Sequence, residues 1–92
     1  MLIALDYDGT YTLDPAFWAE FISNVRARGH KVICATMRND DEVEEVRRVM
    51  WPHAIPVYHT RRMAKGPALA AAGIFPDIWI DDRPQWIARD AA

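Results

Sequence analysis

LIALDYDGT (residues 2–10) is the stretch that decides the fold of this sequence. Its first four residues are apolar without alternation, which is typical of a strand that is buried on both faces of a parallel sheet. The polar residues that follow include a glycine and predict a turn at the carboxyl end of that strand. The stretch therefore predicts a strand that delivers two carboxylates, Asp6 and Asp8, to one edge of a sheet.

Further strand-like segments recur along the rest of the chain. Residues 31–36 and 77–81 are mainly apolar and read as the second and fourth strands, and residues 54–58 read as the third. Pro56 lies inside the third segment and has no N–H to donate to a neighbouring strand. We therefore expect the third strand at an edge of the sheet.

Helix signals separate these strands. Asp14-Pro15 is an N-cap followed by proline at the first helical position, and Gly29 is expected to end that helix. Asn39 followed by Glu42 is a capping-box pattern, which predicts that the acidic residues 40–42 form the first turn of the second helix. Two further helices are expected over residues 65–72 and 84–91.

The alternation of strands and helices predicts an α/β fold. We expect a doubly wound, Rossmann-like parallel sheet of about four strands, flanked by helices on both faces. The length of 92 residues predicts a single domain over residues 1–92. A chain of this length has no room for a second domain above a site, so no cap domain is expected.

Composition excludes several classes of protein. The hydrophobic content of 51% argues against disorder, and the apolar runs are far shorter than the ~20 residues of a membrane span. A net charge of −2 argues against a dedicated DNA-binding module. The single cysteine, Cys34, fits a reducing compartment, so a cytoplasmic protein without a signal peptide is expected. Cys34 itself lies within a strand and is expected to be inert core.

Polar side chains gather at the predicted strand ends. In open parallel sheets, ligands bind beyond the carboxyl ends of the strands, near the point where the strand order reverses. The residues expected at that edge are Asp6, Asp8, Thr36, Lys65, Asp81 and Asp82. Carboxylates that converge repel one another, and Mg²⁺ resolves this because it is held by carboxylates and water.

The remaining polar groups match a phosphate. A lysine, a threonine hydroxyl and backbone amides of residues 7–10 are suitable donors to phosphate oxygens. An aspartate beside a second carboxylate can act as a nucleophile with an acid/base partner. The set therefore predicts Mg²⁺-dependent phosphoryl chemistry through an aspartyl-phosphate.

These residues resemble the motifs of the haloacid dehalogenase superfamily. DYDGT (residues 6–10) after an apolar strand is similar to the first motif of that family, and Thr36, Lys65 and Ile80-Asp81-Asp82 follow in the family's order. The resemblance covers essentially the whole chain. It implies a minimal, capless phosphatase or phosphotransferase, because phosphatases of the family usually carry the second aspartate, here Asp8.

The resemblance also implies a role for each matching residue. Asp6 would attack phosphorus, and Asp8 would protonate the leaving oxygen and later activate water. Thr36 would hydrogen-bond the phosphoryl group, and Lys65 would neutralise charge on the nucleophile and the phosphate. The residues implied for Mg²⁺ are Asp6, Asp8 through its backbone carbonyl, Asp81, and Asp82 directly or through water. Gly9, Thr10 and Arg38 are the further candidates for contact with the substrate, and Thr10 would also orient the Asp8 loop.

Two alternatives to an enzyme of this kind remain. A phospho-accepting receiver domain also combines aspartates, Thr, Lys and Mg²⁺, but its accepting aspartate follows the third strand. Here Tyr58-His59-Thr60 follows that strand and contains no acid, which disfavours a receiver. The second alternative is a binding or scaffolding domain that keeps the motifs but has little or no turnover.

Other candidates have a functional and a structural interpretation that the sequence does not separate. His59, Arg61 and Arg62 are either a substrate clamp or a solvated loop, and Arg38 either touches phosphate or does not. The four tryptophans, at positions 18, 51, 79 and 86, belong either to the core or to an interface. An uncapped site favours a phosphorylated substrate that is macromolecular, or a homodimer or partner protein that covers the site. No motif identifies the substrate.

Overall fold

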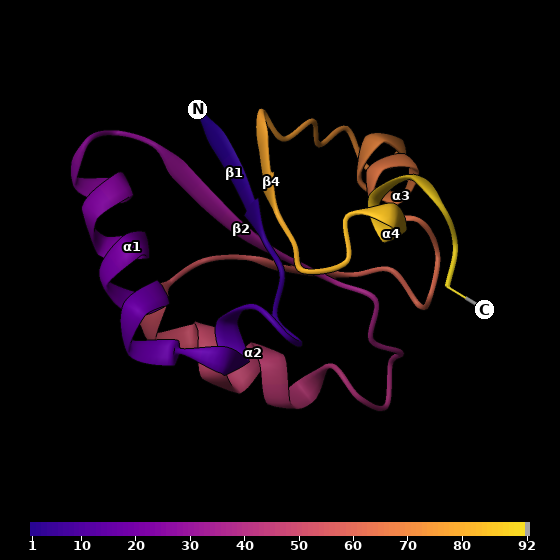
Figure 1. The fold of residues 1–92 in the computed structure, drawn as a ribbon, viewed down its shortest axis with the longest axis horizontal. Coiled ribbons are helices and arrows are strands. Elements are labelled where there is room, and N and C mark those ends of the chain that lie inside the picture. The colour runs from indigo at the N-terminus through magenta and orange to yellow at the C-terminus, as the bar shows by residue number, and fades with distance from the viewer. Residues whose placement is uncertain (92) are drawn as a thin grey trace.

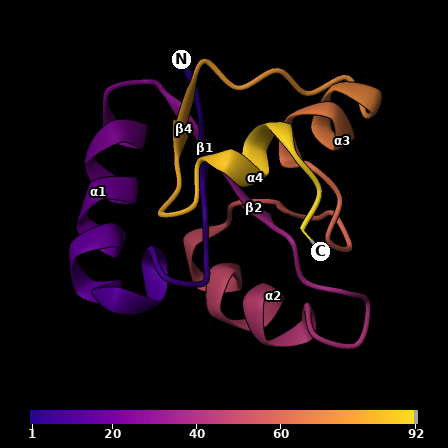
Figure 2. The same cartoon turned by 45° about the vertical axis from the view of Figure 1, so that its right-hand side comes forward.

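The structure, a computed structural model, describes residues 1–91 as alternating strands and helices. The elements in chain order are β1 (Leu2–Leu5), η1 (Tyr11–Leu13), α1 (Pro15–Ala27), β2 (Lys31–Thr36), α2 (Glu44–Met50), η2 (Trp51–His53), β3 (Val57–His59), α3 (Lys65–Ala71), β4 (Ile78–Ile80) and α4 (Gln85–Ala88). Figures 1 and 2 show the strands at the centre, with α1 on one side of them and α3 and α4 on the other.

The four strands form one parallel sheet in the order β3-β2-β1-β4. The chain runs outward from β1 to β3 and then returns to place β4 on the opposite side of β1. The strand order therefore reverses between β1 and β4, which is where such sheets bind ligands. The predicted α/β class with a doubly wound parallel sheet is confirmed, and β3 lies at an edge as Pro56 predicted.

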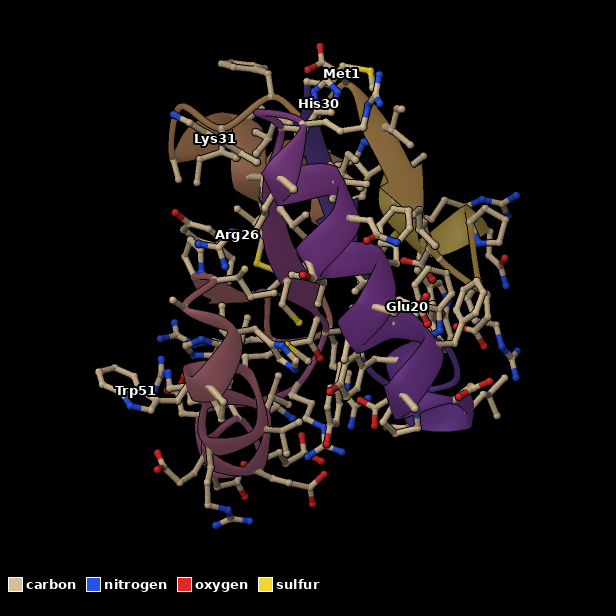
Figure 3. All side chains as sticks on the ribbon, turned by 90° about the vertical axis from the view of Figure 1, so that its left-hand side faces the viewer. Met1, Glu20, Arg26, His30, Lys31 and Trp51 are labelled. Carbon is tan, nitrogen blue, oxygen red and sulfur yellow. The ribbon has the colours of Figure 1, made fainter. Side chains whose placement is uncertain are left out.

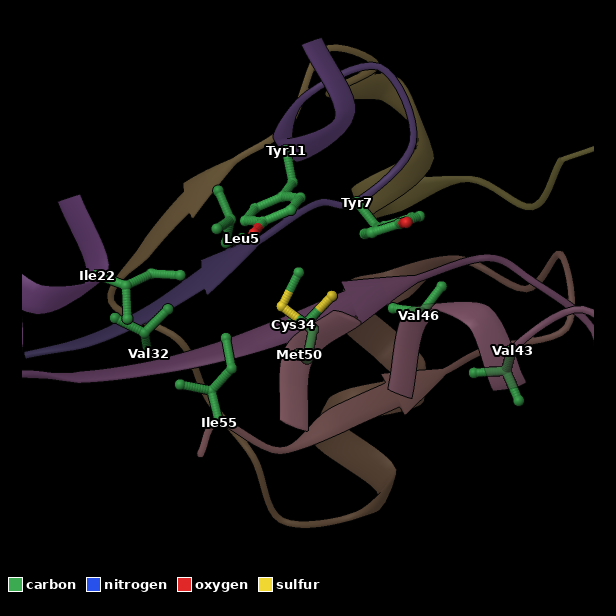
Figure 4. Close-up of a cluster of buried hydrophobic side chains, with 10 residues drawn as sticks. All are labelled: Leu5, Tyr7, Tyr11, Ile22, Val32, Cys34, Val43, Val46, Met50 and Ile55. Carbon is green, nitrogen blue, oxygen red and sulfur yellow. The ribbon is translucent and has the colours of Figure 1, made fainter. Parts of the chain in front are cut away.

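Two hydrophobic clusters hold the helices to the two faces of the sheet. Figure 4 shows the larger one, in which side chains of β1 and β2 meet those of α1 and α2. Its buried members are Leu5, Tyr7, Tyr11, Ile22, Val32, Cys34, Val43, Val46, Met50 and Ile55. The smaller cluster, on the opposite face, consists of Ala4, Ile33, Ala35 and Leu69 of α3. Successive strand residues thus point to opposite faces, as the pleat requires.

The first half of the fold follows its sequence signals closely. β1 and β2 have the predicted bounds. The Asp14 carboxylate accepts a hydrogen bond of 3.1 Å from the backbone N–H of Phe17, and Pro15 is the first helical residue. Gly29 follows α1 with φ of +87°, a conformation that favours glycine. These local signals are therefore sufficient to place α1, the helix that follows β1 and packs against β2.

The predicted start of the second helix is wrong. α2 begins at Glu44, and residues 40–42 form a turn before it. Glu42 does accept a hydrogen bond of 2.9 Å from the backbone N–H of Asn39, which is half of a capping box. This bond closes the turn instead of starting the helix, and the acids of the first helical turn are Glu44 and Glu45.

Smaller corrections concern the later elements. The predicted strand at residues 54–58 begins only at Val57, because Pro56 cannot continue a ladder of N–H donors. The strand predicted at residues 77–81 is limited to Ile78–Ile80, and the flanking aspartates lie outside it. α3 ends at Ala71, one residue before the expected end, and the last helix covers only Gln85–Ala88 instead of residues 84–91.

The segments between the strands contain no further domain. Residues 6–30 hold only η1 and α1, and residues 37–56 hold only α2 and η2. In the described part of the chain, no helix is long and apolar enough to span a membrane. Trp51 is 83% exposed and projects away from the body of the protein in Figure 3, so this tryptophan is not part of the core.

Candidate active site

The aspartates predicted at the site lie at the reversal of strand order. Asp6 follows β1 directly, and Asp81 and Asp82 follow β4 directly. The backbone N–H of Asp6 donates to the carbonyl of Ile80 at 3.0 Å, so the pairing of the two strands continues to the site. The parallel sheet thus brings together carboxylates that are more than 70 residues apart in the chain.

Lys65 joins the aspartates of the two strands. Its Nζ lies 2.7 Å from Oδ1 of Asp6 and 2.6 Å from Oδ2 of Asp81. The side chains are almost fully buried, with exposures of 2% for Lys65, 7% for Asp6 and 2% for Asp81. Burial alone would lower the pKa of Lys65, but the neighbouring carboxylates raise it above its usual value. The ammonium group therefore stays charged and links β1 to β4.

The carboxyl group of Asp6 has a strongly raised pKa. Burial raises the pKa of its carboxyl to about 7, although the charge of Lys65 and the hydrogen bond from it act in the opposite direction. Asp81 adds to the increase because it carries a like charge. In the metal-free protein, the folded structure thus disfavours the ionised form of Asp6.

This perturbation predicts a pH-dependent stability in the metal-free protein. The folded-state pKa of Asp6 lies above the usual value of 3.8, so its stabilising contribution is complete below pH 3.8 and is lost as pH rises through about 7. The full difference corresponds to at most about 4 kcal/mol. In EDTA, we expect Asp6→Asn to match the wild type near pH 4 and to exceed it by about 2–4 kcal/mol at pH 8.

Urea unfolding of both proteins from pH 4 to pH 9 measures this difference. Asp14→Asn is the matched control, because asparagine is also a good N-cap and position 14 lies outside the site. A constant difference between Asp6→Asn and wild type across this range would contradict a raised pKa at Asp6.

Thr10 connects Asp6 to Asp82. Its hydroxyl lies 3.1 Å from Oδ2 of Asp6 and 3.4 Å from Oδ1 of Asp82, and it accepts a hydrogen bond of 3.2 Å from the backbone N–H of Asp82. Thr10 is buried, and so is its hydrogen bond to Asp6, whereas the two contacts with Asp82 are only partly buried. Its contacts are with the two carboxylates, and they position the groups that a cation or a phosphate would meet.

Gly9 provides room for Asp82. It has φ of +78°, and a Cβ at this position would lie 2.4 Å from Oδ2 of Asp82. Its backbone N–H donates to the hydroxyl of Thr12 at 3.0 Å, and the N–H of Thr10 donates to the carbonyl of Tyr7. These two of the four amides expected as phosphate donors are thus used inside the loop.

Asp8 does not join the other carboxylates. Both of its oxygens are bound by Arg38, with Nη2 2.7 Å from Oδ1 and Nε 2.9 Å from Oδ2. The hydrogen bonds to Asp8 raise the pKa of Arg38 further above its usual value. The structure therefore places Arg38, a candidate for substrate contact, against the candidate acid/base.

A cleft of about 570 Å³ opens above these residues. This volume is within the range of small-molecule sites. Its lining residues are Asp6, Asp8, Thr36, Met37, Arg38, Asp41, Glu42, Glu44, Glu45, Arg62, Lys65, Asp82 and Trp86. Thr36 is buried at its floor, and its hydroxyl accepts a hydrogen bond of 3.3 Å from the backbone N–H of Arg38. The hydroxyl hydrogen of Thr36 remains free to donate.

The three cationic candidates at the end of β3 and in the loop after it have different partners in the structure. Arg62 lines the cleft, with Nη2 3.5 Å from Oε1 of Glu42. His59 and Arg61 are not among the lining residues and instead bind Asp40, at 2.7 Å and 2.8 Å. Hydrogen bonds from Arg61 and His59 lower the pKa of Asp40 below its usual value. Of the three, only Arg62 is placed to meet a ligand.

Three further residues near the site belong to the core. Tyr7 and Tyr11 are buried and stack with ring centroids 5.8 Å apart, so both pack in the core. Cys34 is fully buried, and burial raises the pKa of its thiol to about 12. This thiol is therefore protonated at neutral pH and inert, as its place in a strand predicted.

Some cleft residues were missed by sequence reasoning. Glu44 and Glu45 begin α2, which follows the loop after β2, and Trp86 belongs to α4, which follows β4. A helix that follows a strand starts at the same edge as that strand's carboxyl end. This rule could have identified the acids of α2, had the start of that helix been placed correctly.

The donor set suits a hard cation. One carboxylate oxygen from each of Asp6, Asp81 and Asp82 lies within 4.8 Å of the other two. All three ligands are oxygen atoms, which is the donor type that Mg²⁺ takes in proteins. The chemistry of these residues is thus compatible with Mg²⁺ at this point.

Comparisons with known proteins reveal no relative of this chain. The chain matches no protein-family model, no curated protein and no solved structure. The arguments about function that follow therefore depend on the residues and geometry of this chain.

Proposed function

We propose that this protein is a Mg²⁺-dependent phosphomonoester hydrolase of the haloacid dehalogenase type, with Asp6 as its nucleophile. The observation that carries the proposal is the contact of buried Asp6 with the Lys65 ammonium, at the reversal of strand order and on the floor of a cleft. A buried carboxylate beside a fixed cation is a suitable nucleophile for a phosphate, whose charge the same cation neutralises.

The proposed reaction has two steps. An oxygen of Asp6 bonds to phosphorus while the bond from phosphorus to the leaving oxygen breaks, and Asp8 gives that oxygen its proton. Asp8 then takes a proton from water, whose oxygen attacks phosphorus and releases phosphate and free Asp6. Lys65 and the Thr36 hydroxyl donate to the phosphoryl oxygens throughout. Mg²⁺, held by Asp6, Asp81 and Asp82, would supply positive charge for the phosphate.

The proposed substrates carry their phosphate on a group that extends out of the cleft. No domain lies in the segments that follow β1 and β2, where a cover would have to be inserted. The phosphorylated end of a macromolecule therefore suits the site, and so does a smaller phosphomonoester if a second copy or a partner protein covers it. A panel of phosphometabolites, phosphopeptides and 3′- or 5′-phosphorylated oligonucleotides separates these substrate classes.

The experiment that tests the activity is hydrolysis of p-nitrophenyl phosphate with Mg²⁺ and with EDTA. We expect activity only with Mg²⁺, and a loss of at least about 10³-fold in Asp6→Asn. Asp14→Asn, a change of the same kind outside the cleft, is expected to keep full activity. Equal rates in wild type and Asp6→Asn would exclude the covalent mechanism.

Beryllium fluoride distinguishes an enzyme from a binding domain. A ¹⁹F spectrum of a bound fluoride species that requires both Asp6 and Mg²⁺ would indicate a site able to form an acyl phosphate. That signal without turnover of any substrate would favour the binding domain over the hydrolase. Transfer of phosphate to an added alcohol in place of water would instead indicate a phosphotransferase.

A further inference from the structure

Arg38 has almost no donor left for a ligand. Nε and Nη2 bind the two oxygens of Asp8, Nη1 donates to the backbone carbonyl of Glu42 at 2.9 Å, and Nη2 also lies 3.4 Å from Oε2 of Glu45. A guanidinium group has five N–H donors. Four of them are therefore committed to the protein itself.

The Tyr7 ring and the Glu45 carboxylate also hold the guanidinium group of Arg38 in place. It lies over the ring of Tyr7, with 5.2 Å between Cζ and the ring centroid. The Tyr7 hydroxyl donates to Oε2 of Glu45 at 3.0 Å, so Tyr7 and Glu45 form a support around Arg38. Tyr7 is itself buried in the main core cluster, which fixes this support to the sheet.

Among residues 1–91, Arg38 is the residue that hydrogen-bonds the side chain of Asp8. The Asp8 side chain is 54% exposed, and both of its oxygens are bound by Arg38. A bidentate arginine–carboxylate pair sets the position and the plane of the carboxylate together. The orientation of Asp8 above the cleft floor is thus determined by Arg38.

We propose that Arg38 is a positioning residue, which holds the Asp8 carboxylate in place for proton transfer and does not itself bind the phosphate. This inference rests on the function proposed above, in which Asp8 transfers the proton. It changes the role of Arg38 from substrate contact to orientation of a catalytic group. It also gives α2 a part in the site, because Glu45 of α2 holds the arginine together with the backbone carbonyl of Glu42, which precedes the helix.

A double-mutant cycle tests this role. Wild type, Arg38→Met, Asp8→Asn and the double variant are compared for hydrolysis of p-nitrophenyl phosphate with Mg²⁺. We expect Arg38→Met to lower kcat about 10²-fold with KM changed less than threefold. In the Asp8→Asn background, Arg38→Met is expected to have no further effect, because the group that it positions is already gone.

Rescue and a matched control complete the experiment. Free guanidinium added to Arg38→Ala is expected to restore at least one tenth of the lost kcat, which a purely structural role would not allow. Arg48→Met on the exposed face of α2 is expected to keep wild-type kinetics. A KM raised tenfold or more at unchanged kcat in Arg38→Met would show that Arg38 binds the substrate and would overturn the proposal. Multiplicative losses in the double variant would overturn it as well.

A second readout separates this inference from the proposed function. The Nε–H signal of Arg38 in a ¹H–¹⁵N spectrum is expected to be protected from exchange in the wild type and to lose that protection in Asp8→Asn. Protection without any Asp6-dependent hydrolysis would overturn both the proposed hydrolase and the positioning role of Arg38 in proton transfer, while confirming the ion pair. An unprotected signal in an active wild type would overturn the inference alone.

Discussion

Lys65→Met is expected to destabilise the metal-free protein by about 3–5 kcal/mol at pH 8, the cost of leaving a buried charge without its partner. Methionine has a similar unbranched shape, so packing changes little. The loss comes from Asp6 and Asp81, which remain buried within 2.7 Å of where the ammonium was. Since typical domains are stable by only about 5–15 kcal/mol, this variant is close to unfolding.

The same variant offers an internal check. At pH 5 the destabilisation is expected to be smaller, because Asp6, whose pKa is raised to about 7, is then protonated and no longer repels Asp81. Lys65→Met/Asp6→Asn is expected to recover at least half of the loss at pH 8, since one of the two unpaired charges is gone. Urea unfolding in EDTA measures all three proteins. A Lys65→Met stability within about 1 kcal/mol of wild type at pH 8 would contradict the buried ion pairs.

Gly9→Ala is expected to impair the cation site more than the fold. An alanine at φ of +78° costs about 1–2 kcal/mol, and its Cβ would lie 2.4 Å from Oδ2 of Asp82. The Asp82 side chain is 37% exposed and can rotate away, but it then leaves Thr10 and the other carboxylates. We expect Mg²⁺ affinity, measured by isothermal titration calorimetry, to fall about 10–100-fold.

Gly29→Ala is the matched control for this prediction. Gly29 has φ of +87°, and a Cβ there would meet nothing within 4 Å. Both variants are expected to lose a similar amount of stability from the backbone, so the difference in Mg²⁺ affinity isolates the contact with Asp82. Equal Mg²⁺ affinity in the two variants would show that Asp82 does not contribute to the cation site.

The sequence predicted the architecture because its signals are local. An unbroken apolar run indicates a buried strand, and the Asp14-Pro15 start and Gly29 stop of α1 depend on neighbours only a few residues away. The start of α2 was predicted wrongly for a physical reason. The bond from Asn39 to Glu42 is the same in a turn as in a capping box, and only the packing of Val43 and Val46 decides where the helix begins.

The sequence predicted which residues lie at the candidate site, but it did not predict which of their side chains pair with one another. The rule for strand ends brought Asp6, Thr36, Lys65 and Asp81 to one edge, where the structure places them. The partner of Arg38 could not be derived, because its choice between a phosphate and Asp8 depends on side-chain directions at the ends of different strands. Likewise, no pattern separates Arg62, which faces the cleft, from its neighbour Arg61, which pairs with Asp40.

The pairing of β1 with β4 determines when the site forms during folding. Thr10 and Asp82 are 72 residues apart, and Lys65 and Asp6 are 59 apart, so the site depends on contacts between residues far apart in the chain. Closing such large loops is slow compared with forming α1 or α2. A nascent chain released from the ribosome only as far as β3 contains Asp6 but neither Lys65 nor the aspartates that follow β4. The site is therefore complete only late in folding, and under the proposed function the recovery of activity during refolding would measure the docking of β4.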